Sequence, residues 1–319
     1  MRELMTEDLG RGAPPPSHPA GRTRFGAWRI EALIADGGCG SVYRARHVVL
    51  DRPAAVKVLH PALADDPAMV ARFIQEAQAV NRIRHPHIVD VIDVGQVAGQ
   101  PYLVMELLDE RNLEQRLTAD GRLTLAECLA IFTPLCQALA AAHAAGFVHR
   151  DVKARNIGFT ADATAALRLL DFGIAKLLAP EDDRGATATM RVGTPHCVAP
   201  EQIRGLGVDA RTDVYALGVL LFHLATGVYP FDADDSTEVE RMHLDAPPPR
   251  PSALVPGLAV VDALVAAAMA KARDARPPSA TAFLAALTTA TAPPPAARRA
   301  FHRRAPIRRV PAAARWSVR

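Results

Sequence analysis

The feature that most constrains this chain is a short polar stretch, residues 149–156, which reads HRDVKARN. Within it Asp151 is followed by Lys153 and Asn156, and Asp171 opens an Asp-Phe-Gly triplet twenty residues after Asp151. An aspartate so placed can orient and deprotonate a hydroxyl group, while an asparagine and a second aspartate can hold Mg²⁺ on a nucleotide phosphate. The alternative is a turn between two strands with chance polar residues, so the rest of the chain has to supply the partners that this chemistry needs.

Charge is distributed unevenly along the 319 residues. The formal net charge is +3, but residues 290–319 hold eight arginines and no acid, which leaves −5 (+3 minus +8) for the rest. A basic tail on a mildly acidic domain predicts contact with an acidic partner, nucleic acid or anionic lipid, and the alternative is a solvated tail without a partner. This tail and residues 1–24 lack periodicity, so both are expected to be disordered.

The cysteines and the apolar segments indicate the compartment. Cys39, Cys128, Cys136 and Cys197 form no CxxC pair and no zinc-ligand spacing, so reduced thiols are expected. The N-terminus lacks the apolar core of a signal peptide, and the longest apolar run, residues 254–270, is interrupted by Pro, Gly and Asp. The sequence therefore predicts a cytoplasmic protein without a transmembrane segment.

Hydrophobic periodicity divides the chain into a β-rich part and a helical part. Strands are predicted over residues 25–34, 41–47, 54–59, 88–94 and 100–106, with one helix over 67–84. After a short β region that includes residues 167–170, helices predominate, over residues 123–145, 201–203, 212–226, 236–244, 259–272 and 279–288. We therefore expect an α+β fold with a small antiparallel β lobe of about residues 25–107 and a larger, mostly helical lobe of about residues 111–288.

A glycine-rich turn joins the first two predicted strands at residues 36–40. Glycine lets backbone N–H groups approach a phosphate closely, so the hairpin can cover a nucleotide as a lid. Ala35 replaces the first glycine of the usual GxGxxG pattern, and glycine hairpins are common, so this signal is weak alone. The residues assigned to the lid are Ile34, Ala35, Gly37, Gly38, Cys39, Gly40 and Val42.

Two further segments are candidate nucleotide contacts. Lys57 lies inside an apolar strand and needs a charged partner, which Glu76 on the predicted helix supplies; the alternative is a solvated lysine on an edge strand. Such an ion pair aims the ammonium group at the α- and β-phosphates. Met105, Glu106 and Leu108 begin the connection between the two parts of the chain, where main-chain N–H and C=O groups can bind an adenine edge.

In order and spacing, residues 25–288 resemble the eukaryotic-like (Hanks-type) serine/threonine protein kinases of bacteria. The resemblance rests on the lid, Lys57, Glu76, the 149–156 stretch and Asp171, followed by Gly193-Thr194-Pro195, Ala199-Pro200-Glu201, residues 213–218 and Arg276-Pro277. It implies a two-lobed protein kinase fold. The implied activity is transfer of the γ-phosphoryl group of Mg-ATP to Ser or Thr hydroxyls of proteins, with Mn²⁺ as the alternative ion.

The resemblance also implies a role for each matching residue. Asp151 is the catalytic base, Lys153 contacts the γ-phosphate, Thr194 bridges these two side chains, and Asn156 and Asp171 hold the metal ion. Structural roles are implied as well: Asp213 holds the backbone of the 149–156 stretch, Glu201 pairs with Arg276, and a regulatory spine is formed by Val80, Val91, His149 and Phe172.

Around the adenine, the resemblance places Val42 and Ala55 above the ring and Gly158 below it. Gly158 stands where the family usually has a larger apolar residue. We therefore predict weaker ATP binding, and a lower KM for ATP in the variant Gly158→Leu.

Regulation by phosphorylation is also expected. Phosphorylation in trans is expected at Thr187 and Thr189, with Arg150 as the receiver of the phosphate, and the alternative is a flexible acidic loop.

Three other functions are alternatives to an active protein kinase. A pseudokinase would bind nucleotide without catalysis, and the intact catalytic residues argue against it. A small-molecule kinase would share the Asp–Asn–Asp set, but the motifs around Thr194 and Glu201 indicate a protein substrate. Scaffolding through the basic tail is compatible with activity.

Overall fold

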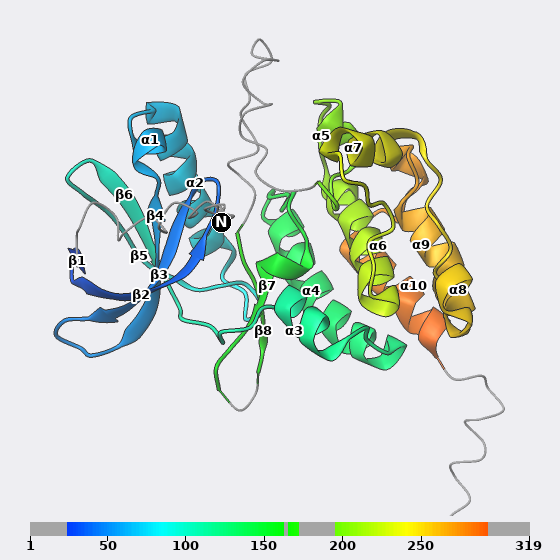
Figure 1. The fold of residues 1–319 in the computed structure, drawn as a ribbon, viewed down its shortest axis with the longest axis horizontal. Coiled ribbons are helices and arrows are strands. Elements are labelled where there is room, and N and C mark those ends of the chain that lie inside the picture. Colours follow the sequence, from blue (N-terminus) through cyan, green and yellow to red (C-terminus); the bar gives the residue numbers. More distant parts are fainter. Residues whose placement is uncertain (1–23, 163–164, 172–194, 293–319) are drawn as a thin grey trace, which may run out of the picture.

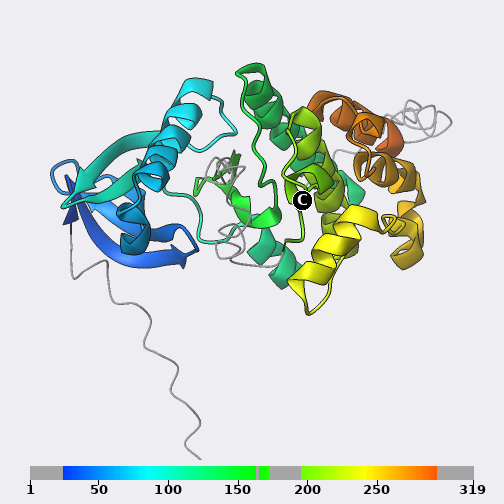
Figure 2. The same cartoon turned by 90° about the horizontal axis from the view of Figure 1, so that it is seen from above.

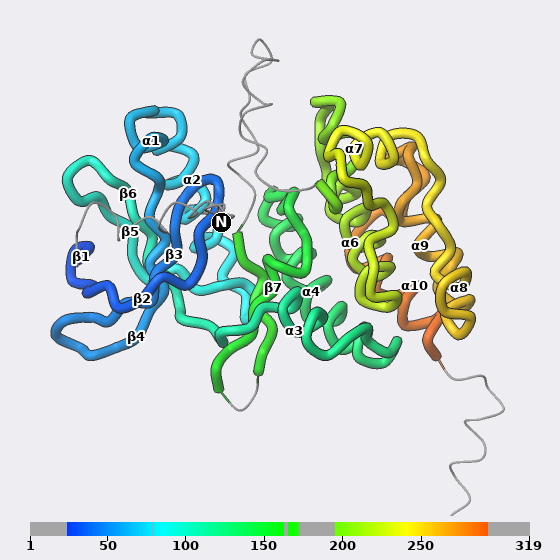
Figure 3. Tube along the Cα trace, viewed as in Figure 1, coloured from blue at the N-terminus to red at the C-terminus, as the bar shows by residue number. Residues whose placement is uncertain are grey.

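The computed structural model describes residues 24–162, 165–171 and 195–292, which form a β-rich lobe and a helical lobe (Figure 1). The Cα trace passes from the first lobe to the second between β6 and α3 (Figure 3). The predicted leader (1–24) and tail (290–319) fall almost wholly outside the described residues, as do Phe172, Thr187, Thr189 and Thr194.

The β lobe is a six-stranded antiparallel sheet in the order β1-β2-β3-β4-β6-β5. Its strands are β1 (Arg24–Phe25), β2 (Trp28–Asp36), β3 (Gly40–His47), β4 (Pro53–Leu59), β5 (Val91–Val97) and β6 (Gln100–Met105). Alternate residues, among them Trp28, Tyr43, Val56 and Val104, pack into one core, because side chains alternate between the two faces of a strand. The other face is left for Lys57 and its neighbours.

Two helices join β4 to β5, α1 (Pro61–Ala64) and α2 (Pro67–Ile83). The α2 helix begins with a cap in which the Asp66 side chain accepts a hydrogen bond from the Ala68 N–H, with proline in the first turn. Its apolar side chains Phe73 and Ala77 pack with sheet residues. This packing turns Glu76, one residue before Ala77, toward the sheet.

The helical lobe surrounds α4 (Leu125–Ala144) and α6 (Ala210–Thr226). Thr124 and Glu127 form a capping box at the start of α4, and Gly146, with φ of 81°, follows its end. The remaining helical elements are α3 (Leu113–Asp120), α5 (Pro200–Ile203), α7 (Ser236–Asp245), α8 (Pro251–Leu254), α9 (Asp262–Ala268) and α10 (Ala280–Thr291), with the 3₁₀ turns η2 (Ala154–Asn156), η5 (Pro256–Val261) and η6 (Arg273–Ala275).

Among the described residues, α4 is the one helix long and apolar enough to cross a membrane, by length and composition only. Its side chains Phe132, Leu135 and Leu139 are fully buried, and Phe132 packs on Phe283 of α10 with ring centroids 5.5 Å apart. This packing is that of a core helix of the lobe.

A two-stranded hairpin, β7 (Ile157–Phe159) and β8 (Leu167–Leu169), lies between the lobes (Figure 2). The Leu169 N–H donates to the His87 carbonyl (2.8 Å), and the Val89 N–H donates to the Leu169 carbonyl (3.1 Å). The strand that leads into Asp171 is therefore joined to the segment before β5.

Two predicted elements differ from the structure, and helix α3 was not predicted. The strand expected over residues 88–94 is β5, Val91–Val97, because residues 87–89 bond to β8 instead. The helix expected over 259–272 is split into η5 and α9 and ends at Ala268. Helix α3 was not predicted, since only Leu113 and Leu117 of its eight residues are buried.

Candidate active site

The 149–156 stretch is held from below by Asp213, which is fully buried in the first turn of α6. Its Oδ2 accepts from the His149 N–H (2.9 Å) and its Oδ1 from the Arg150 N–H (2.8 Å). His143 of α4 also contacts Oδ2, at 2.7 Å from its Nε2. These bonds fix a backbone that is strained at Arg150, whose φ is 66°, and the expected Asp213 anchor is present.

Two side chains converge on Asp151. Lys153 Nζ lies 2.9 Å from Asp151 Oδ2. The Asn156 Nδ2 donates to the same oxygen (3.0 Å) and to the Asp151 main-chain carbonyl (2.8 Å). The carboxylate is therefore oriented by an ammonium and an amide, and the three residues predicted from spacing lie together.

Lys57 lies on β4 between two carboxylates. Its Nζ is 2.7 Å from Asp171 Oδ1 and 3.5 Å from Glu76 Oε1. Burial alone would lower the pKa of Lys57, but the two carboxylates outweigh it and raise the pKa. Burial raises the pKa of the Glu76 carboxyl. The expected Lys57–Glu76 pair is present, but Asp171 is the nearer partner.

Asn156 and Asp171 are the candidate metal ligands. The Leu170 N–H donates to the Asn156 main-chain carbonyl (2.8 Å), so the two segments that carry these residues are joined directly before Asp171. The Asn156 amide nitrogen is used toward Asp151, which leaves its amide oxygen for other partners. Asp171 has a φ of 45°, outside the usual range of a non-glycine residue.

Sheet register gathers the candidate adenine contacts on one face of the β lobe. Val42 pairs with Lys57 across β3 and β4, and Ala55 pairs with Met105 across β4 and β6. Because Ala55 and Lys57 are two residues apart, all four side chains share the face opposite the Trp28 core. Ile34, Ala35 and the glycines form the end of the β2–β3 hairpin beyond this face.

Leu108 fills the space beside Gly158. A Cβ atom placed on Gly158 would lie 2.6 Å from Leu108 Cδ1 and 3.5 Å from Leu170 Cδ1. A side chain from the connecting segment therefore occupies the position that a larger residue at 158 would need.

The Glu106 side chain is bonded to Arg168, a residue that was not among those predicted from the sequence. Glu106 Oε1 accepts from Arg168 Nε of β8 (2.8 Å) and from the Asp90 N–H (2.9 Å). Arg168 Nη1 also donates to the Pro86 carbonyl at 2.5 Å. These four residues join three parts of the chain: the interlobe connection, the segment that precedes β5, and strand β8. We call them the Arg168 clamp.

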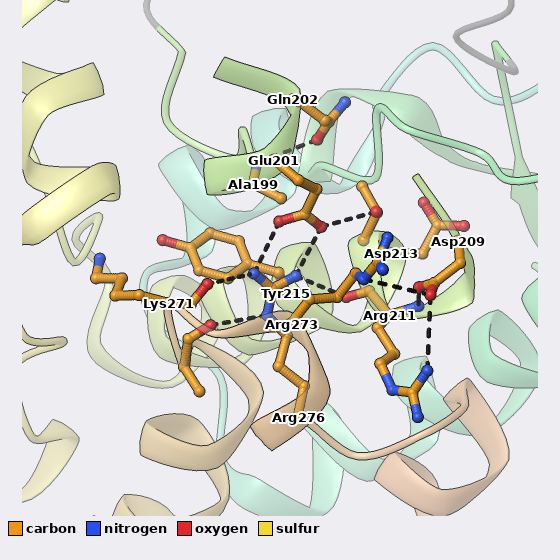
Figure 4. Close-up of polar contacts among 12 residues, drawn as sticks. Ala199, Glu201, Gln202, Asp209, Arg211, Asp213, Tyr215, Lys271, Arg273 and Arg276 are labelled. Atoms are coloured by element: carbon orange, nitrogen blue, oxygen red, sulfur yellow. Dashed lines mark hydrogen bonds and ion pairs between the residues drawn. The ribbon is translucent and has the colours of Figure 1, made fainter. Parts of the chain in front are cut away.

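Glu201 and Arg276 form a buried two-point ion pair in the helical lobe (Figure 4). The Arg276 Nη1 and Nη2 donate to Glu201 Oε1 (2.7 Å) and Oε2 (2.8 Å). Thr212 adds a hydrogen bond to Oε1 (2.8 Å), and the Arg276 guanidinium lies 4.8 Å from the centroid of the Tyr215 ring. Burial opposes the charge on Glu201, but these bonds outweigh it and lower the pKa of the carboxyl.

Three stacked rings support the segment that follows the undescribed residues 172–194. The His196 ring lies 4.0 Å from the Tyr229 ring, which lies 3.8 Å from His223 on its other side. The Tyr229 hydroxyl donates to Glu114 Oε2 (3.2 Å). The sequence gives no sign of this column of rings, because its members come from segments far apart in the chain.

These features define a protein kinase domain, and comparison with known proteins agrees. The family model described as "Protein kinase domain" matches residues 28–276, and the chain belongs to this family. Protein kinases use ATP and a divalent metal ion.

The curated relatives are bacterial serine/threonine kinases. The chain is 38% identical to the serine/threonine-protein kinase pkn3 of Myxococcus xanthus over 282 residues, which is 86% of this chain and 52% of that protein. It is 39% identical to PknB of Mycobacterium tuberculosis over 261 residues, which is 80% of this chain and 41% of that protein. The chain thus spans about half or less of the length of these relatives.

Solved structures give the same class. The crystal structure of the Mycobacterium tuberculosis PknI kinase domain superposes with a TM-score of 0.68 at 31% identity, and the match covers 84% of this chain and 97% of that one. The fold is that of a bacterial Hanks-type serine/threonine protein kinase, as the sequence predicted.

Proposed function

We propose that this chain transfers the γ-phosphoryl group of Mg-ATP to serine and threonine hydroxyls of proteins. The observation that carries the proposal is the grouping of Asp151, Lys153 and Asn156 within 3.0 Å contacts, with Asn156 joined to the segment that ends in Asp171. Phosphoryl transfer requires little covalent chemistry from the protein, so positioning and charge neutralisation supply most of the catalysis.

In this mechanism Asp151 accepts the proton of the attacking hydroxyl. The Lys153 ammonium and the Asn156 amide fix the direction of the carboxylate, so the hydroxyl is oriented before transfer. Lys153 is also proposed to contact the γ-phosphate, and Thr194, which lies outside the described residues, is proposed to bridge it to Asp151. Lys57 is paired with both Glu76 and Asp171. When the nucleotide binds, Lys57 would keep Glu76 and exchange Asp171 for the α- and β-phosphates.

Asn156 and Asp171 fit a magnesium ion. Both offer the hard oxygen ligands that Mg²⁺ prefers, and this ion is usually held by one or two protein groups together with substrate phosphates and water. The described residues contain no group of three or more His, Cys, Asp or Glu that would bind a metal ion alone. A bound cation would neutralise phosphate charge, and Mn²⁺ suits the same ligands.

The remaining nucleotide contacts are proposed on the shared sheet face. Val42 and Ala55 cover the adenine from above, the main chain from Met105 to Leu108 binds its edge, and Leu108 lies below it beside Gly158. The lid of residues 34–42 covers the phosphates.

Activation by phosphorylation in trans at Thr187 and Thr189 is part of the proposal. Arg150, next to the catalytic aspartate, is half-buried, and burial lowers the pKa of its guanidinium. Among the described residues its Nε has no hydrogen-bond partner. A phosphate carries about −1.5 to −2 charge and would supply one. Mass spectrometry should find these sites in the active protein and not in Asp151→Asn.

Partner and location are proposed from composition. None of the four cysteines is in a disulfide bond, which suits the reducing cytoplasm where ATP is available. The basic tail, residues 290–319, is proposed to bind an acidic partner, nucleic acid or anionic lipid. Salt-dependent binding to DNA and to anionic vesicles, measured with and without these residues, distinguishes the choices.

The test of the activity is transfer of radiolabelled phosphate from ATP to a generic protein acceptor, followed by phosphoamino-acid analysis. Asp151→Asn should lower kcat about a thousandfold, which corresponds to about 4 kcal/mol of barrier. Lys57→Met should be similarly impaired. Asp235→Asn, in the cap of α7, is the matched control and should keep full activity.

Two outcomes would contradict the proposal. Nucleotide binding without transfer by the wild-type chain would indicate a pseudokinase. Transfer to hydroxylated small molecules, with none to protein, would indicate a small-molecule kinase.

A further inference from the structure

The tip of the lid is gripped by one residue outside it. His60 follows the last residue of β4 and precedes α1. Its Nε2 donates to the Gly37 carbonyl at 2.6 Å, and its backbone N–H donates to the Cys39 carbonyl at 3.1 Å. One residue therefore binds two carbonyl groups of the glycine turn.

The anchor is fixed from behind. The side chain of Gln100, which is buried, donates to the carbonyl of Leu59 directly before His60 (3.0 Å). Gly40 lies so close to β4 that an added Cβ would be 2.2 Å from the Val58 carbonyl oxygen. The stem of the lid thus rests on the end of β4, and His60 extends this contact to the tip.

The tip is narrow because it is bonded across itself. The Gly37 N–H donates to the Gly40 carbonyl (3.1 Å), and the Gly40 N–H donates to the Gly37 carbonyl (3.3 Å). The Ser41 hydroxyl donates to Asp36 Oδ1 (2.6 Å). A bond to the Gly37 carbonyl therefore constrains the position of the whole turn.

The bond also sets a direction. A trans peptide unit is planar, so the carbonyl of Gly37 and the N–H of Gly38 point to opposite sides of the chain. When His60 binds that carbonyl, the Gly38 N–H is turned away from His60. Because a carbonyl only accepts, Nε2 carries the hydrogen in this bond.

We propose that His60 is a positioning residue of the nucleotide lid. It holds the glycine turn in one orientation, so that the lid amides are prearranged for the phosphates of ATP. The proposal rests on the proposed function only in taking a nucleoside triphosphate as the ligand under the lid. Its effect falls on nucleotide binding, since the bonds of His60 are to the lid and not to Asp151.

The experiment compares His60→Ala with His60→Gln in the full-length chain. Alanine removes the side-chain donor, whereas glutamine retains an N–H donor. His47→Ala is the matched control, because His47 also holds a hairpin end, by accepting from the Val49 and Leu50 N–H groups at the far end of β3. Steady-state kinetics with Mg-ATP and titration with fluorescent methylanthraniloyl-ADP are the two measurements.

His60→Ala should raise the KM for ATP and the Kd for the fluorescent nucleotide about twofold to tenfold, the range expected for one lost hydrogen bond, with kcat within about twofold. His60→Gln and His47→Ala should stay close to the wild type. Amide hydrogen exchange of residues 36–41 should quicken in His60→Ala alone.

Unchanged KM and Kd in His60→Ala, or a loss confined to kcat, would overturn the proposal. Equal effects of alanine and glutamine would overturn it too, because the donor would then be irrelevant. If the wild type binds nucleotide but transfers no phosphate, the proposed function fails, and the titration still decides the role of His60.

Discussion

At the scale of single residues, a leucine and a glycine fifty positions apart share one space beside the proposed adenine site. Leu108 Cδ1 occupies the position that a side chain at residue 158 would need. We therefore expect apolar contact with a bound ring to come from the interlobe connection and not from β7.

We predict that Leu108→Ala raises the KM for ATP about threefold to tenfold, through lost apolar contact. Adding Gly158→Leu to that variant should lower the KM again. Gly158→Leu alone should raise the KM or leave it unchanged, contrary to the expectation from sequence. A lower KM in this single variant would show that Leu108 does not take the place of an apolar side chain at residue 158.

The residues of the 149–156 stretch were predictable because their chemistry depends on short spacing along one segment. Asp151, Lys153 and Asn156 meet in the structure as their order implies. The position of Leu108 beside Gly158 was not predictable, because it depends on packing between two segments that are far apart in the sequence.

At the scale of elements, tertiary pairing decides what local pattern leaves ambiguous. Ile88 and Val89 read as the start of a strand, but their segment bonds in parallel to β8, and β5 begins only at Val91. Helix α3 did carry a local signal: Asn112 and Gln115 form a capping box that a search for this motif would have found.

The Arg168 clamp makes the interlobe connection and β8 one mechanical unit. Arg168 and Glu106 are each about one-fifth exposed, so their interaction is less screened than a surface pair. We predict that Arg168→Leu or Glu106→Gln lowers the free energy of unfolding by about 1–3 kcal/mol. Denaturant unfolding of both variants and the double variant measures the coupling.

The control for this pair is Arg241→Leu. Arg241 and Glu238 form an exposed ion pair on α7, so little change is expected on its removal. Additive effects of Arg168→Leu and Glu106→Gln in the double variant would contradict a direct coupling.

At the scale of the whole molecule, the Glu201–Arg276 pair closes the helical lobe by joining α5 to the segment before α10. Arg276→Met should cost about 3–5 kcal/mol of stability, because it leaves a buried carboxylate unpaired. Arg276→Met combined with Glu201→Leu should recover much of this loss. Thermal or denaturant unfolding provides the measurement, and a double variant weaker than Arg276→Met would contradict the argument.

Acid stability of the whole chain should depend on His243, which is buried on α7. Its Nδ1 lies 2.8 Å from the Tyr215 hydroxyl oxygen, within hydrogen-bond distance. Burial, with the nearby charge of Lys271, lowers the pKa of His243 to about 3 in the folded chain. The unfolded pKa is about 6.5.

Between these two pKa values the unfolded chain binds a proton that the folded chain does not. The free energy of unfolding therefore falls as the pH falls below 6.5, by about 1.4 kcal/mol per pH unit for this group, and is unaffected by it above that pH. From pH 7 to pH 5 the loss due to His243 is about 2 kcal/mol. In His243→Asn, whose amide can still hydrogen-bond to the Tyr215 hydroxyl, the loss over this interval should be smaller by that amount. Urea unfolding at both pH values tests this, with His47→Asn as the matched control that keeps the wild-type dependence. Equal losses in His243→Asn and the wild type would show that this histidine does not govern acid stability.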